Sequence, residues 1–215
     1  MYDVKNTLPV TGLILAGGRS SRMNGHDKGL LKLLNKPMIY HVIERLKAQV
    51  GAILISANRH LETYQQFGYP VLVDDYDDYR GPLAGMSRGL SHTSSEYLLT
   101  VPCDGPLLPL DLAEKFLQHA QRTQAKAIIA FDGKYKQPTY NLIHKDLLSP
   151  LTQSLEQGEH KLGKWLIDNG AVRLDFSKQK EAFLNVNTLD DLQLLSQQLS
   201  HIKKHSIPED DPQTV

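Results

Sequence analysis

The sequence predicts an α/β fold built on a doubly wound, mostly parallel sheet. Several short apolar runs are continuous rather than alternating, which is typical of strands covered on both faces. Between these runs, apolar residues recur three and four positions apart and indicate helices that pack one side against the sheet. Because strands and helices alternate, the strands are expected to run parallel, with ligands bound beyond their carboxyl ends.

Eight strands are predicted from the apolar runs. In chain order they span residues 11–16, 52–57, 71–73, 97–101, 127–131, 140–143, 172–175 and 183–186. Three helices are predicted between them, from the periodic apolar residues of segments 39–50, 112–120 and 147–155. A last helix begins near Thr188, which can cap it, and carries Leu192, Leu195 and Leu199 inward.

One domain is expected over residues 1–204. A chain of 215 residues with 40% hydrophobic content can bury a single substantial core, and no internal repeat or linker divides it. Residues 205–215 contain two prolines and three acidic residues with little apolar content. They are predicted to form a flexible C-terminal tail.

Composition excludes several classes of function. No apolar run approaches the ~20 residues that span a bilayer, and the N-terminus lacks a signal-peptide pattern, so a cytoplasmic protein without membrane contact is expected. The 24 basic and 24 acidic residues balance, which argues against extended nucleic-acid binding. The single cysteine, Cys103, excludes an intramolecular disulfide and is interpreted as a small buried residue.

Residues 13–34 form the most informative segment. An apolar run ends at Gly17 and Gly18, small and basic residues follow, and Lys28 precedes a second apolar run. Glycines let backbone N–H groups approach an anion closely, and Arg22 and Lys28 add cationic donors. The segment is therefore interpreted as a cradle for a polyphosphate. The alternative is a glycine-rich surface turn with solvated charges.

Two common phosphate-binding motifs are excluded. A Walker A loop needs Ser or Thr directly after its lysine, whereas Gly29 and Leu30 follow Lys28. The dinucleotide motif Gly-x-Gly-x-x-Gly also fails, because Arg19 stands where the second glycine is required. Neither an ordinary NTPase nor a dehydrogenase is indicated.

The ordered motifs of the chain resemble those of molybdenum cofactor guanylyltransferases, the molybdopterin-guanine dinucleotide biosynthesis protein A family. The resemblance runs from about residue 12 to about residue 200. It rests on Leu-Ala-Gly-Gly-x-x-x-Arg-Met with a following Asp-Lys, and on segments 56–60, 81–86, 102–104 and 185–188. The first loop marks nucleotidyltransferases in general, and the ordered set points to this family.

The resemblance implies a nucleotide-diphospho-sugar transferase fold, which is Rossmann-like. The implied reaction transfers GMP from GTP to the phosphate of molybdopterin and releases pyrophosphate. Arg22, Lys28 and Asp104 are the implied catalytic residues. The implied GTP-binding residues lie in the first loop and at strand ends: Leu15, Ala16, Gly17, Gly18, Lys28, Ser56, Asn58, Asp74, Gly81 and Asp104.

Asp104 is the expected ligand of the Mg²⁺ cofactor. It follows the strand 97–101 through Pro102 and Cys103, which places a carboxylate at a carboxyl-terminal strand edge beside the expected phosphates. Magnesium is bound in this way by one or two carboxylates together with phosphate oxygens and waters. Taken alone, an Asp-Gly-Pro sequence also suits a turn, so the metal role rests on the resemblance.

Asp74 is the expected specificity residue. Guanine presents N1–H and an amino group as adjacent donors, which a carboxylate can accept. The sequence does not decide whether Asp74 meets the base or the ribose. Nor does it decide between Ser56, which aligns with an asparagine in well-known relatives, and Asn58, which β alternation places on the same face. Gly81 and Gly85 fit either a close approach to the nucleotide or helix packing.

The second substrate is expected near the C-terminal part of the site. Asn185 and Asn187 alternate on the predicted strand 183–186 and its continuation, so both can face the cleft, or they can cap the last helix. The resemblance also puts Gln137 to Thr139 and Lys161 near the pterin. Lys164 and Trp165 are interpreted as ordinary surface and core residues of a helix.

Two other functions remain compatible with the motifs. One is a related enzyme that uses CTP or UTP on molybdopterin or on a sugar or alcohol phosphate. The other is a non-catalytic module that senses nucleotide and hands the cofactor to apoenzymes. The expected partners are GTP, molybdopterin and, transiently, other proteins of molybdenum cofactor handling.

Overall fold

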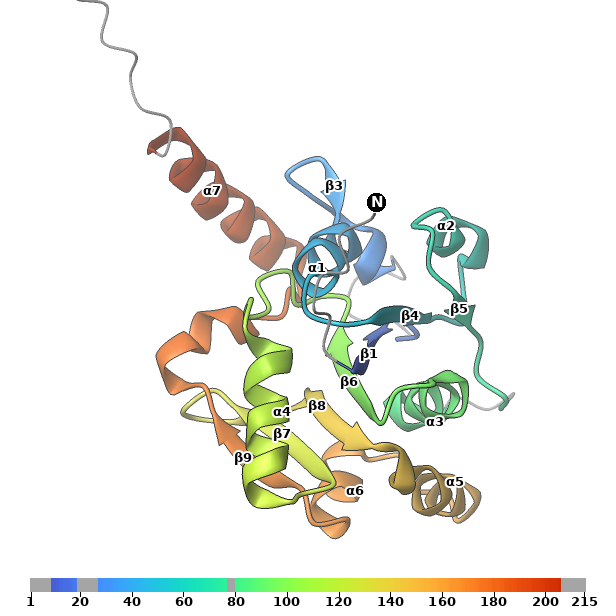
Figure 1. Ribbon diagram of the computed structural model, residues 1–215. Helices are drawn as coiled ribbons and strands as arrows, with labels where there is room; N and C mark the ends of the chain where they lie inside the picture. Colours follow the sequence, from blue (N-terminus) through green and yellow to red (C-terminus); the bar gives the residue numbers. More distant parts are fainter. Residues whose placement is uncertain (1–8, 19–26, 77–79, 206–215) are drawn as a thin grey trace, which may run out of the picture.

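A seven-stranded sheet forms the centre of the computed structural model, which describes residues 9–18, 27–76 and 80–205. The strand order is β5-β4-β1-β6-β8-β7-β9 (Figure 1). The strands are β1 (Val10–Leu15), β4 (Ala52–Ser56), β5 (Val71–Leu72), β6 (Tyr97–Pro102), β7 (Ala127–Phe131), β8 (Lys136–His144) and β9 (Val172–Asp175). A separate hairpin pairs β2 (Lys32–Leu33) with β3 (Lys36–Pro37).

The sheet is mostly parallel and reverses its winding between β1 and β6. The chain adds β4 and then β5 on one side of β1, and it returns to place β6 on the other side. Among the described strands of this sheet, β8 alone is antiparallel, and it pairs with β6 and β7. The predicted doubly wound topology is therefore confirmed. Its switch point lies beyond the carboxyl ends of β1 and β6, where ligands bind in such sheets.

Helices cover both faces of the sheet, which explains the continuous apolar runs. One face carries α1 (Met38–Leu46), α2 (Leu61–Gln65) and α4 (Leu112–Thr123), and the other carries α3 (Pro82–His92), α5 (Leu148–Glu156) and α6 (Leu162–Asp168). Along β1, Val10 and Ile14 are buried toward the first group, whereas Leu13 is buried toward the second. A strand between two helical layers needs apolar residues on both of its faces.

The start of α3 brings a helix close to the end of β4. Gly81 has a φ of 66° before Pro82 begins the helix, a conformation that glycine adopts without strain. Inside the helix, a Cβ on Gly85 would collide with Oγ of Ser56 and would crowd Leu15. Of the two roles predicted for Gly85, close approach to the nucleotide or helix packing, the structure supports helix packing.

The last helix, α7 (Leu189–His205), projects from the sheet beside the β2–β3 hairpin (Figure 1). The N–H of Asp191 donates to Oγ1 of Thr188, and the N–H of Thr188 donates to a carboxylate oxygen of Asp191. These reciprocal bonds form a capping box and confirm the predicted helix start. The predicted tail lies outside the described residues, apart from His205 at the end of α7.

The strand predicted at 183–186 is wrong. Phe183 ends a 3₁₀ helix, Ser177–Phe183, and residues 184–187 pair with no strand of the described part of the chain. The N–H of Val186 instead donates to the carbonyl oxygen of Asp104. Phe183 and Val186 are buried, and this burial produced an apolar pattern that resembled a strand. The observed β8 is longer than predicted, because its first half carries polar residues in an antiparallel hairpin.

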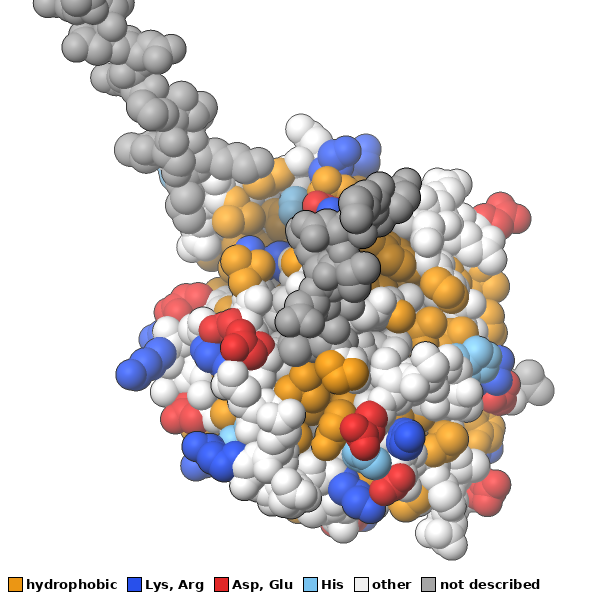
Figure 2. Space-filling view, viewed as in Figure 1, with side chains coloured by type: hydrophobic (Ala, Val, Ile, Leu, Met, Phe, Trp, Pro, Cys, Tyr) orange, Lys and Arg blue, Asp and Glu red, His pale blue; other side chains and the backbone are white. Residues whose placement is uncertain are grey.

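The surface agrees with the balanced composition. On the face shown in Figure 2, basic and acidic side chains of the described residues are interspersed, with no large region of one sign. Among the helices of the described residues, none is long and apolar enough to cross a membrane.

Candidate active site

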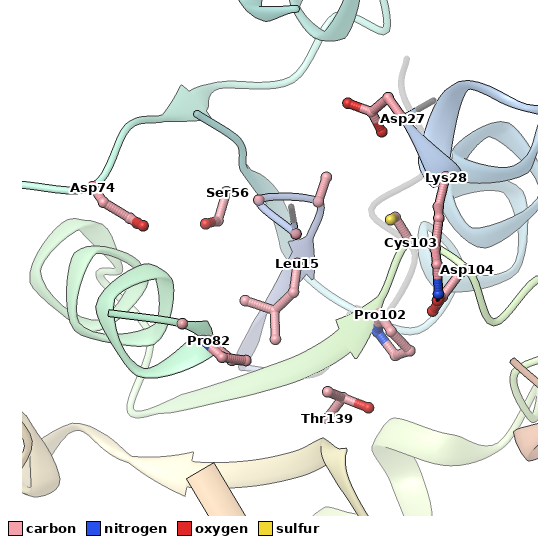
Figure 3. Close-up of a pocket in the computed structure, with 14 residues that line it drawn as sticks. Leu15, Asp27, Lys28, Ser56, Asp74, Pro82, Pro102, Cys103, Asp104 and Thr139 are labelled. Carbon is pink, nitrogen blue, oxygen red and sulfur yellow. The ribbon is translucent and has the colours of Figure 1, made fainter. Parts of the chain in front are cut away.

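A cavity of about 370 Å³ opens at the switch point of the sheet (Figure 3). Its walls come from the carboxyl ends of β1, β4, β5 and β6, from the start of the 3₁₀ turn Lys28–Leu30, from the start of α3 and from β8. The lining residues are Leu15, Ala16, Gly17, Gly18, Asp27, Lys28, Ser56, Asp74, Gly81, Pro82, Pro102, Cys103, Asp104 and Thr139. Nine of them are predicted GTP-binding residues, so the structure brings together segments that are far apart in sequence.

One end of the cavity carries a lysine held by two acceptors. Nζ of Lys28 lies 3.0 Å from Oδ2 of Asp104 and 2.7 Å from Oδ1 of Asn187. Figure 3 shows the Lys28 side chain pointing at Asp104. Both side chains of this ion pair are largely shielded from solvent, which strengthens the attraction between them. The pair leaves a cation fixed at the place where the sequence predicts phosphates.

The chain after Asp104 is anchored by the segment that leads to α7. The carbonyl oxygen of Asp104 accepts the N–H of Val186, and the carboxyl-terminal neighbour of that residue, Asn187, contacts Lys28. Oδ1 of Asn185 lies 3.4 Å from the hydroxyl of Tyr140, which is fully buried on β8. Both predicted asparagines therefore lie beside Asp104, although no strand carries them.

The other end of the cavity carries a carboxylate clamped by an amide. Nδ2 of Asn58 donates to Oδ2 of Asp74 at 2.7 Å, and the N–H of Asp74 donates to Oδ1 of Asn58 at 2.9 Å. Oδ1 of Asp74 is shielded from solvent and has no hydrogen-bond partner among the described residues. A shielded acceptor without a donor is costly, so this oxygen is suited to a donor supplied by a ligand.

Burial is the largest influence on the pKa of Asp74 and raises it above its ordinary value, whereas the Asn58 hydrogen bond lowers it. Asn58→Ala removes that hydrogen bond and leaves the burial in place. We expect the pKa of Asp74 to rise further in this variant, so that the carboxyl group binds its proton at a higher pH. A ¹³C NMR titration of the Asp74 carboxyl carbon measures the shift. The same titration midpoint in Asn58→Ala and in the unmodified protein would contradict the role of the Asn58 hydrogen bond.

Ser56 and Asn58 have different places in the structure. Ser56 ends β4, is buried and lines the cavity, and Figure 3 shows the Asp74 side chain pointing toward it. Asn58 lies beyond the end of β4, outside the lining, and both polar atoms of its amide are engaged by Asp74. Ser56 therefore faces the cavity directly, whereas Asn58 is connected to it through Asp74.

Among the predicted site residues that the structure describes, four do not line the cavity: Asn58, Asn185, Asn187 and Lys161. Arg22 lies outside the described residues. Lys161 is exposed at the start of α6 and does not line the cavity, although the carbonyl of the preceding His160 approaches Gly81. Trp165 is buried and Lys164 pairs with Asp168 on the surface, as predicted for both.

Four residues that line the cavity were not among the predicted site residues: Asp27, Pro82, Pro102 and Cys103. Thr139 also lines it and belongs to the segment 137–139 that the resemblance puts near the pterin. The pairing Asp-Lys in the first motif was the available signal for Asp27, which is 8% exposed. Cys103 is buried beside it, and burial raises the pKa of its thiol well above the ordinary value. The thiol is therefore protonated at neutral pH, as expected for a packing residue rather than a nucleophile.

The acidic groups of the cavity suit a metal ion that is held jointly with a ligand. No cluster of three or more His, Cys, Asp or Glu side chains suited to a metal ion occurs within the described part of the chain. Three carboxylates line the cavity, those of Asp27, Asp74 and Asp104, and of these Asp104 pairs with the fixed lysine. This donor set fits Mg²⁺, which is bound by one or two carboxylates plus phosphate oxygens and waters.

Comparisons with known proteins agree with this arrangement. Residues 12–172 match the family described as "MobA-like NTP transferase domain". A protein of Shewanella loihica named molybdenum cofactor guanylyltransferase is 45% identical over 192 residues, which cover 89% of this chain and 98% of that protein. Among solved structures, the molybdopterin-guanine dinucleotide biosynthesis protein A of Archaeoglobus fulgidus has a TM-score of 0.74 at 20% identity, with 89% of this chain and 99% of that chain covered. A nucleotidyl transferase of Methanothermobacter thermautotroptrophicus has a TM-score of 0.71 at 18% identity, with 90% and 98% covered.

Proposed function

Because the chain belongs to the molybdenum cofactor guanylyltransferases, within the MobA-like NTP transferases, we propose that it transfers GMP from GTP to molybdopterin. A phosphate oxygen of molybdopterin attacks the α-phosphorus of GTP. A new P–O bond forms, the bond from the α-phosphorus to the oxygen that bridges to the β-phosphorus breaks, and pyrophosphate leaves. The product is the guanine dinucleotide form of the cofactor.

One observation supports this function best: a single cavity joins Lys28 and the Gly17–Gly18 backbone to the Asp74 carboxylate. Lys28 and the Gly17–Gly18 backbone supply cationic and N–H donors for the triphosphate. Asp74 supplies a carboxylate that can accept the adjacent donors of guanine. The attacking phosphate is ionised near neutral pH, so the reaction requires positioning and charge neutralisation rather than a general base.

In this proposal, Asp104 would hold Mg²⁺. When bound, the ion neutralises charge on the transferring phosphate. Lys28 keeps the Asp104 carboxylate oriented toward the cavity, and Asn187 keeps Lys28 in place on its other side. The pterin side then extends past Asn187, Asn185 and Thr139, with Lys161 outside the cavity lining. The reaction takes place in the cytoplasm.

The function is tested by measuring pyrophosphate release with each of the four nucleoside triphosphates in the presence of molybdopterin and Mg²⁺. We expect GTP to be the preferred substrate, with turnover that depends on both molybdopterin and Mg²⁺. A preference for CTP or UTP would overturn the proposal in favour of a related enzyme. Tight GTP binding without turnover would indicate a nucleotide-sensing module.

A further inference from the structure

The hydroxyl of a fully buried tyrosine reaches the residue that caps the 3₁₀ turn carrying Lys28. Tyr64 lies on α2 and is 0% exposed. Its hydroxyl donates to Oδ1 of Asp27 at 2.6 Å, between residues 37 positions apart in the chain. Burial is the main cause that raises the pKa of this hydroxyl, so the group remains a neutral donor at physiological pH. The hydrogen bond to a carboxylate is of the strong, charge-assisted kind.

Asp27 in turn fixes the backbone that carries Lys28. The same oxygen, Oδ1, accepts the N–H of Gly29 at 3.1 Å and caps the 3₁₀ turn Lys28–Leu30. A Cβ on Gly29 would lie 2.6 Å from the Tyr64 hydroxyl, so a glycine is needed for this close approach. Lys28 is thus anchored at its backbone by Asp27 and at Nζ by Asp104 and Asn187.

The segment that contains Tyr64 also contacts the beginning of the phosphate-binding loop. The guanidinium of Arg59 donates to the carbonyl oxygen of Gly18 at 2.9 Å. One residue earlier, Asn58 clamps Asp74 at the other end of the cavity. Residues 58–64 therefore connect to both sides of the loop and to the expected guanine contact.

We propose that Tyr64 is a positioning residue that acts through Asp27 to place Lys28 on the triphosphate. The role rests on the proposed function, because it needs GTP as the ligand of the cavity. Tyr64 does not line the cavity and touches no ligand itself. Its hydroxyl sets the orientation of the Asp27 carboxylate, and that carboxylate sets the turn from which the Lys28 side chain extends.

The first test is Tyr64→Phe, which removes one oxygen and keeps the buried ring. We expect affinity for GTP, measured by titration calorimetry, and kcat/KM for pyrophosphate release to fall about tenfold, because small misplacements of catalytic groups are costly. Tyr97→Phe is the matched control. Tyr97 begins β6 at the end of the sheet away from the cavity, and this change is expected to leave both values unchanged.

The second test separates positioning from general loss of structure. If Tyr64 acts through Lys28, adding Tyr64→Phe to a Lys28→Ala variant causes no further loss of GTP affinity. If Tyr64→Phe acts by a purely structural effect on the cavity, it lowers GTP affinity by the same factor in the Lys28→Ala variant as in the unmodified protein. That result would overturn the proposal. Thermal unfolding of each variant shows how much protein is folded at the assay temperature.

Asp27 supplies a variant that remains informative if Tyr64→Phe fails to fold. Asp27→Asn keeps an acceptor for both Tyr64 and Gly29 and is expected to retain GTP affinity within about threefold, whereas Asp27→Ala is expected to lose about tenfold. Equal losses in the two variants would mean that the charge of Asp27 matters for its own sake, and would overturn the positioning role.

The outcomes also distinguish this role from the proposed function. If the unmodified protein neither binds GTP nor releases pyrophosphate, the proposed function fails. If it does both, and Tyr64→Phe behaves like Tyr97→Phe, only the positioning role fails.

Discussion

Asp104→Ala is expected to lower the rate of pyrophosphate release by about a thousandfold. The substitution removes the carboxylate that lines the cavity at the end of β6 and pairs with Lys28 at 3.0 Å. Charge stabilisation by a bound metal ion is worth several kcal/mol, and each ~1.4 kcal/mol is a factor of ten in rate. Steady-state assays with GTP, molybdopterin and increasing Mg²⁺ measure the loss. The variant is also expected to lose its response to Mg²⁺.

The fold should tolerate this substitution, because the backbone bond from Val186 to the Asp104 carbonyl does not involve the side chain. Asp146→Ala is a suitable control. It removes another carboxylate–lysine pair, Asp146 with Lys126 at 2.8 Å, from an exposed position that does not line the cavity. This control is expected to keep full turnover. Turnover like that of the unmodified protein in Asp104→Ala would rule out the single-carboxylate metal site.

The parallel core of the fold was predictable because its strands are buried on both faces. The predicted ranges match β7 and β9, differ by a residue at one end of β4, β5 and β6, and are shifted by one residue at both ends of β1. The apolar pattern gave wrong strand assignments where a segment is buried without pairing, or pairs without being apolar. Segment 183–186 buries Phe183 and Val186 without pairing, and β8 pairs along a polar first half that has no alternating signal.

The part of the site that could be predicted lies at the carboxyl ends of the parallel strands. Gly17, Asp74 and Asp104 come directly or nearly directly after apolar runs, so their convergence followed from the parallel topology. The contacts that hold these groups were not predictable in the same way. Tyr64 meets Asp27 from another helix, and Asn58 turns to Asp74 because β4 ends at Ser56. A single polar contact across the chain leaves no periodic pattern in the sequence.

The second large effect is expected at the end of the cavity that carries Asp74. Asp74→Asn is expected to lower kcat/KM for GTP about a hundredfold. The carboxylate offers one oxygen held by Asn58 and one shielded oxygen without a partner among the described residues. Hydrogen bonds to a charged acceptor are worth ~1.5–3 kcal/mol, and replacing one oxygen with an amide nitrogen removes an acceptor and sets a donor against a donor. Pyrophosphate release measured over a range of GTP concentrations gives the value.

Substrate analogues assign this loss to the base or to the ribose. ITP keeps the N1–H of guanine but lacks its exocyclic amino group, and 2′-deoxy-GTP lacks a ribose hydroxyl. If the Asp74 carboxylate accepts both base donors, the unmodified protein prefers GTP to ITP and Asp74→Asn loses most of this preference, while its preference for GTP over 2′-deoxy-GTP is unchanged. The opposite pattern would place Asp74 on the ribose. Guanine selection would then have to come from other groups of the cavity, among which Ser56, buried at the end of β4, faces the Asp74 side chain.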